Sequence, residues 1–206
     1  MSKADFKFGP RIAAPDYAKI TTDAQQQVLK ELGLDRPENV VAMARPDLLL
    51  EKASQIVQQA DAELGLHLAE RDKAIGHLWF YEQRLGLAKS AGLTHTGYRN
   101  VLSVVLHGNK KQPVGDFRTV PELVAAAEAA GVERVDNAEQ KLLEAAPIVV
   151  AARARRETAI RYQHDAVLAL LRPPYKWSTD KIADLAGIDR KLVLRQKYAA
   201  EKRETA

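Results

Sequence analysis

The segment Leu87–Gly108, LAKSAGLTHTGYRNVLSVVLHG, constrains the fold most, because its spacing predicts two helices joined by a tight turn. Leu87 and Ala91 are four residues apart and therefore share one face of the first helix. Gly92 follows and can adopt the positive φ that such a turn often needs. Thr94 is placed to cap the second helix, because its side-chain oxygen can accept a hydrogen bond from a free backbone N–H.

The second helix of this segment has two different sides. Tyr98 and Val101 are expected on its buried side. The outward side carries hydrogen-bonding groups rather than simple solubilising charges: His95, Thr96, Arg99 and Asn100.

A second segment, Lys181–Tyr198, repeats the pattern around Gly187. Apolar residues stand at the matching offsets: Ile182, Ala183, Ala186, Ile188 and Val193. Only Gln196 departs, since the first copy has Val101 at that position. This departure predicts poorer packing of the last helix, or an earlier end to it. The outward side is mostly cationic: Arg190, Lys191, Leu194 and Arg195.

With this spacing, residues 84–107 and 179–200 each resemble the helix-turn-helix superfamily of DNA-binding proteins. The resemblance implies that the second helix of each pair enters the major groove of double-stranded DNA. The residues that it makes candidates for DNA contacts are Thr94, His95, Thr96, Arg99, Asn100, Arg190, Lys191, Leu194 and Arg195. Lys110 and Lys111, in the loop after the first pair, are candidates for phosphate contacts, or belong to an ordinary polar linker.

The sequences before the two segments are also related. A helix capped by Thr22 or Asp23 and closed by Gly33 corresponds to a helix over Thr119–Gly131. Long helices follow from Arg45 and from about Asn137, with ERDKAI in the first matching RRETAI in the second. We therefore expect an all-α chain built from two divergent copies, a first helical domain at 21–110 and a second at 111–206.

The residues before the first copy, 1–20, lack a helical period and predict an N-terminal arm. Its basic residues could follow a DNA backbone, or the segment could be a disordered terminus, which is the simpler interpretation. These residues are Lys3, Lys7, Arg11 and Lys19.

The long helix from Arg45 carries an apolar stripe that extends beyond what two short neighbouring helices would cover. It could pack against the other half of this chain, or against a second copy in a homodimer. Gly65 and Gly76 are expected to divide or bend it. Residues 79–81, WFY, end it and are expected to plug the core rather than to stack on bases.

Composition narrows the function further. The chain of 206 residues has no cysteine, five scattered histidines and no pattern typical of catalysis, so we expect no enzyme, metal or cofactor. We find no secretion signal and no apolar run long enough to span a membrane, which predicts a cytoplasmic, nucleoid-associated protein.

Basic charge is unevenly distributed along the chain. The net charge is +4, but residues 153–206 hold 13 Lys and Arg against 7 Asp and Glu, a local charge of +6, which leaves −2 for the rest. This distribution suits a polyanionic partner, although a solvated basic face would have a similar composition.

Together these features predict a transcriptional regulator of bacterial, phage or plasmid type that binds duplex DNA through its two helix-turn-helix segments. Two alternatives stay open. One is a helical scaffold or adaptor that binds other proteins through its apolar stripes. The other is a replication or partition factor that uses the same helix-turn-helix segments at a different DNA site.

Overall fold

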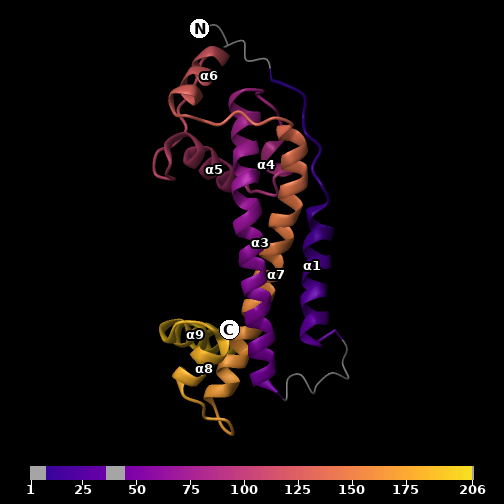
Figure 1. Cartoon of the computed structure of the whole chain (residues 1–206), viewed down its shortest axis with the longest axis vertical. Coiled ribbons are helices and arrows are strands. Elements are labelled where there is room, and N and C mark those ends of the chain that lie inside the picture. Colours follow the sequence, from indigo (N-terminus) through magenta and orange to yellow (C-terminus); the bar gives the residue numbers. More distant parts are fainter. Residues whose placement is uncertain (1–7, 36–44, 206) are drawn as a thin grey trace. The chain divides into compact units, whose positions relative to one another are not determined.

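The computed structural model describes residues 8–35 and 45–205, and this part of the chain contains eight helices and no strand (Figure 1). The prediction of an all-α fold is confirmed. The helices are α1 (Tyr17–Leu32), α3 (Pro46–Phe80), α4 (Leu87–Ser90), α5 (His95–His107), α6 (Val120–Ala129), α7 (Ala138–Leu171), α8 (Thr179–Ala186) and α9 (Arg190–Glu204).

The chain forms two compact units, and each unit combines two segments that are distant in sequence. Unit 1 contains Met1–Ala18 and Leu64–Val150, and unit 2 contains Lys19–Glu63 and Ala151–Ala206. Each unit therefore holds the end of one long helix with the helix pair that follows it. It also holds the beginning of the other long helix, with α6 before α7 in unit 1 and α1 before α3 in unit 2.

This division does not follow the boundary near residue 110 that the sequence predicts. The segment before residue 110 and the segment after it are each divided between the two units. The length of the two long helices supplies a physical reason. α3 has 35 residues and so spans about 50 Å, more than one small core can cover. One part of its apolar stripe is buried in unit 1 and the other part in unit 2. The continuous helix α7 likewise contributes one part to each unit.

Each unit has its own apolar core. In unit 1, Ala74, Ile75 and Leu78 of α3 pack with Ala138 and Leu142 of α7. In unit 2, the core joins Leu50 and Ala53 of α3 with Ala166 and Val167 of α7, and α1 adds Val28. Of the two predicted partners for the long stripe, the other half of the same chain is thus the one that covers it in each unit.

The N-terminal residues that the structure describes are packed on unit 1. The backbone N–H of Ile12 donates to the carbonyl of Leu85 at 3.0 Å, and that of Gly9 donates to the carbonyl of Gln83 at 3.1 Å. The Ile12 side chain is 2% exposed. This part of the predicted arm is therefore anchored by backbone pairing and apolar burial, whereas Lys3 and Lys7 lie outside the described residues.

Helix α1 begins five residues before the predicted cap, at Tyr17. Tyr17 also contacts unit 1, because its hydroxyl donates to the carbonyl of Ser90. Burial raises the pKa of Tyr17 to about 12. The predicted end at Leu32, before Gly33 with φ of 73°, is confirmed.

The aromatic residues at the end of α3 form part of the unit 1 core, as predicted. Phe80 is fully buried, and Trp79 packs edge-on against Tyr98 of α5 with a ring separation of 6.2 Å. The hydroxyl of Tyr81 donates to the carbonyl of Val132 at 2.8 Å. These rings are used in packing and are not arranged as a stacking platform.

Of the two effects expected of Gly65 and Gly76, division of α3 does not occur, since the helix continues through both. Gly76 has a packing role instead. A Cβ at this position would lie 2.7 Å from Cγ1 of Val105, so the missing side chain lets α5 approach α3 closely. At Gly65 no neighbouring atom lies within 4 Å of the corresponding point.

These two glycines provide a matched test of the packing in unit 1. Gly76→Ala is expected to lower the free energy of unfolding by about 1–3 kcal/mol, because the added methyl displaces Val105. Gly65→Ala is expected to raise it by about 0.5–1 kcal/mol, because alanine stabilises an open helical position. Urea unfolding followed by circular dichroism measures both, and effects of the same sign would contradict the assignment.

Candidate nucleic-acid interface

The first helix pair consists of α4 and α5 and closely follows the predicted geometry. Gly92 has φ of 63°, and the Thr94 hydroxyl oxygen accepts a hydrogen bond from the backbone N–H of Gly97 at 3.1 Å. Thr94 therefore caps α5, as predicted. A Cβ at Gly92 would lie 2.5 Å from a methyl group of Val150 in α7, so the turn also needs glycine for close packing within unit 1.

The first helix of this pair is only one turn long. The chain between Phe80 and Leu87 is not helical, and its backbone groups pair with the N-terminal segment instead, as at Ile12 and Leu85. The sequence pattern of Leu87 and Ala91 describes the buried face correctly, since both are at most 2% exposed.

The predicted contact residues lie together at the start of α5. Thr94, His95, Thr96 and Arg99 are exposed, and Asn100 is half-buried. On the opposite side, Tyr98 and Val101 pack against the unit 1 core, and burial raises the pKa of Tyr98. In the part of the chain that the structure describes, no salt bridge involves the three cationic residues of this region, which are Arg99, Lys110 and Lys111.

Lys110 and Lys111 are exposed in the loop that follows α5. The Asn109 side chain orders the start of this loop, because its Oδ1 accepts hydrogen bonds from the backbone N–H groups of Lys111 and Gln112 at 3.0 and 3.2 Å. The predicted loop is confirmed. Its two lysines are placed just beyond the C-terminal end of α5 in sequence, whereas the other candidates stand at the N-terminal end.

The second helix pair consists of α8 and α9. Ser178 caps α8 and Asp189 caps α9, where the carboxylate accepts from the backbone N–H of Lys191 at 2.6 Å. Gly187 at the turn has φ of 63°. The residues at the predicted core offsets are buried or pack against the unit 2 core: Ile182, Ala183, Ala186, Ile188 and Val193.

Gln196 is buried at the core position that it shares with Val101 of the first copy. Its side chain is 3% exposed, and α9 continues beyond it to Glu204, so the predicted early end is wrong. The Gln196 amide donates to Oε1 of Gln163 at 2.8 Å. A polar partner on α7, which the sequence pattern did not reveal, thus lets the helix continue.

The outward residues of α9 are exposed: Arg190, Lys191, Leu194 and Arg195. Arg190 lies 3.5 Å from the carboxylate of Asp180, and both side chains are well solvated. The structure adds two features that the spacing did not indicate. The ammonium of Lys181 lies 3.4 Å from the centre of the Trp177 ring, and Tyr198 on α9 is 64% exposed.

The basic charge of residues 153–206 is partly offset within unit 2. By sequence, the segment Lys19–Glu63 of that unit holds 5 Lys and Arg against 8 Asp and Glu, so the unit carries +3 rather than +6. Arg155 on α7 shows how this happens, because it pairs with Glu63 at 2.9 Å and lies 3.7 Å from Glu31. Cations of α9 are paired as well, since the Arg203 guanidinium lies 2.6 Å from the carboxylate of Asp165.

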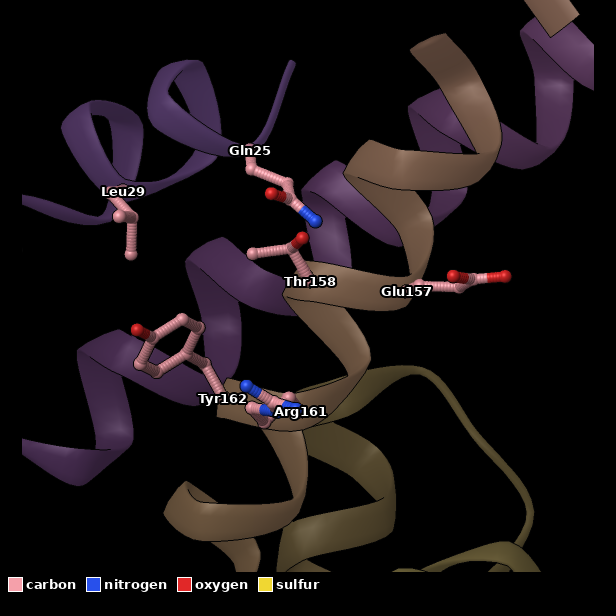
Figure 2. Close-up of a pocket in the computed structure, with 6 residues that line it drawn as sticks. All are labelled: Gln25, Leu29, Glu157, Thr158, Arg161 and Tyr162. Atoms are coloured by element: carbon pink, nitrogen blue, oxygen red, sulfur yellow. The ribbon is translucent and has the colours of Figure 1, made fainter. Parts of the chain in front are cut away.

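Unit 2 also contains a cavity of about 290 Å³ between α1 and α7. Figure 2 shows Gln25 and Leu29 of α1 facing Thr158 and Tyr162 of α7, while Glu157 points away. The Thr158 hydroxyl already donates to the carbonyl of Ala154 at 2.8 Å. Neither helix of the second pair lines this cavity, so it does not belong to the candidate interface.

Comparisons with known proteins do not identify a relative: no protein family, no curated protein and no solved structure matches this chain. Within residues 8–35 and 45–205, no His, Asp and Glu side chains are grouped as a metal site would need. In the same residues, no helix is long and apolar enough to cross a membrane.

The two threonines at the start of α5 allow the capping role to be separated from any contact role. Thr94→Val keeps the shape but removes the hydroxyl acceptor, so the free energy of unfolding is expected to fall by about 1 kcal/mol. Thr96→Val, at an exposed position of the same helical turn, is expected to change it by less than about 0.5 kcal/mol. Thermal unfolding without any ligand measures both, and equal losses would show that the cap contributes nothing.

Proposed function

We propose that this chain binds double-stranded DNA through the N-terminal parts of α5 and α9 and acts as a transcriptional regulator in the cytoplasm. The observation that carries the proposal is the repeated arrangement of a short helix, a left-handed glycine and a capped helix with exposed polar side chains. Both helices bury the opposite side, which holds their exposed residues in defined positions.

The chemistry of α5 suits contacts with base edges. Arg99 donates in a planar fork that matches guanine, and Asn100 offers a donor and an acceptor as adenine requires. Lys110 and Lys111 follow on the same chain segment and would neutralise phosphates, which positions the helix without reading sequence.

The chemistry of α9 is different, because its outward residues are three cations and Leu194. A mostly cationic surface without a varied pattern of donors and acceptors favours phosphates, although Arg190 or Arg195 could still bind a guanine. The proposed DNA site is therefore asymmetric, with a more strictly specified half under α5 than under α9. A homodimer through the long helices would instead give a palindromic site, and footprinting with light scattering of the complex distinguishes the two.

A second candidate function is binding of another protein through α9. Three large apolar side chains of this helix are exposed by 38–64%: Leu192, Leu194 and Tyr198. Leu194 and Tyr198 are four residues apart and share one face of α9, which favours the scaffold or adaptor alternative, whose binding would depend little on salt. A replication or partition factor would bind DNA in the same way as a regulator and differ only in its genomic site.

The first expected result is DNA binding that weakens steeply with salt. If each helix pair neutralises several phosphates, affinity for a diverse duplex pool should fall by orders of magnitude between about 50 and 200 mM salt, because bound counterions are released. Fluorescence anisotropy with labelled duplexes measures this. Binding that is absent at low salt, or that salt does not weaken, would exclude the proposal.

The second expected result separates base contacts from phosphate contacts. Arg99→Ala and His95→Ala should each cost roughly 1–3 kcal/mol of discrimination between a selected site and random DNA. Lys110→Ala should weaken both kinds of DNA about equally, and it serves as the matched control. Uniform losses for Arg99→Ala and His95→Ala would show that these side chains do not read bases.

A further inference from the structure

A second cavity of unit 2 lies directly beneath the second helix pair and has a volume of about 310 Å³. This volume is at the lower end of the range for small-molecule sites. Residues of α3 and α7 line it on one side. Those of the turn and of α9 line it on the other, at Gly187, Ile188, Leu192 and Gln196.

The cavity is polar at two positions where unit 1 is apolar. When ERDKAI is aligned with RRETAI, Gln163 is equivalent to Leu78. When the two turns are aligned, Gln196 is equivalent to Val101. Leu78 is fully buried in unit 1 and Val101 packs against the same core. In unit 2 both glutamines are 3% exposed and both line the cavity. Unit 1 therefore packs its helix pair with apolar side chains at these two positions, where unit 2 has glutamines.

These glutamines belong to a chain of hydrogen bonds in which one acceptor has no donor. The Gln196 amide donates to Oε1 of Gln163, and the Gln163 amide donates to the Ser54 hydroxyl at 2.9 Å. Ser54 in turn donates to the carbonyl of Leu50 at 2.7 Å. Among the described residues, Oε1 of Gln196 is buried without a hydrogen-bond partner. A buried acceptor without a donor is destabilising, which makes two glutamines a costly way to fill a core.

The charged groups that line the cavity do not call for a charged ligand. The Arg156 guanidinium pairs with the carboxylate of Asp61 at 2.6 Å. Burial, with Arg203 nearby, lowers the pKa of His164, so that this ring is neutral at pH 7. The remaining lining combines the uncharged Gln58 amide with apolar side chains, namely Val57, Ile160 and the two apolar residues named above.

We propose that this cavity binds an uncharged small molecule with an apolar ring body and at least one N–H or O–H donor. The donor binds the spare acceptor of the Gln163–Gln196 pair after a rotation of the Gln196 side chain, and the ring packs against Val57, Ile160, Ile188 and Leu192. Because the turn and α9 form one wall, the occupied cavity holds α9 in a defined position against α3 and α7 of unit 2. That last step rests on the proposed function, in which α9 contacts DNA.

The test uses indole, with 1-methylindole as a ring of nearly the same shape that lacks the donor. Indole should bind the full-length chain with a Kd below about 1 mM, and 1-methylindole about tenfold more weakly, since one hydrogen bond is lost. Isothermal calorimetry measures both. Phenol, benzamide and adenine extend the set, and failure of all four donors to bind overturns the proposal.

A double variant, Gln163→Leu with Gln196→Val, introduces the side chains that unit 1 carries at these positions. It should lose indole binding at least tenfold while remaining folded, with Leu78→Met as a control of similar burial in unit 1 that keeps binding. If the double variant does not fold, the side-chain amide signals of the two glutamines in the original chain give the answer by NMR. Unchanged binding in the variant, or unshifted amide signals on adding indole, overturns the site.

DNA affinity provides an independent measurement. Indole should change the affinity of the original chain for duplex DNA and leave that of the double variant unchanged. If indole binds and DNA affinity does not respond, control of α9 by the cavity is overturned while the ligand site stands. If the chain binds no DNA at all, the proposed function fails, and calorimetry still decides the ligand site.

Discussion

The packing of α3 against α7 is the contact on which the other elements of both units depend. Each of these helices is long enough to contribute to two cores, and in each core the partner is a different part of the other helix. Small side chains make this possible, since Ala53 and Ala74 on α3 are fully buried. The helix pairs and the short helices α1 and α6 are attached to these two cores.

This arrangement links the two similar parts of the sequence, residues 21–110 and 111–206. Neither part encloses a core of its own, because the beginning of each long helix packs with the end of the other. Arg155 illustrates the interdependence within unit 2, as a buried guanidinium on α7 whose partners come from α1 and α3. Such a pair is costly to break, because removing the carboxylates would leave a buried charge unsatisfied.

The two units differ beneath their helix pairs. In unit 1, Tyr98 and Val101 of α5 pack against the apolar core, and a glycine on α3 lets α5 approach closely. Unit 2 has a hydrogen-bonded glutamine pair and a cavity at the corresponding place. A densely packed helix pair resists displacement, whereas one that rests on a cavity can respond to what occupies it. On this basis the two proposed DNA contacts differ in mechanical support as well as in charge.

The sequence by itself determined the all-helical class, the cap of α5 and the buried faces of both helix pairs, because these follow from spacing along one chain segment. Thr94, Gly92 and Gly187 are examples, since a cap or a left-handed turn involves only neighbouring residues. Tertiary structure alone decided what Gln196 does, why Gly76 is a glycine and where the basic charge is neutralised. Each of those depends on a partner far away in sequence, namely Gln163, Val105 or Glu63. The periodicity of one helix reveals which face is buried, but it contains no information about which residue meets that face.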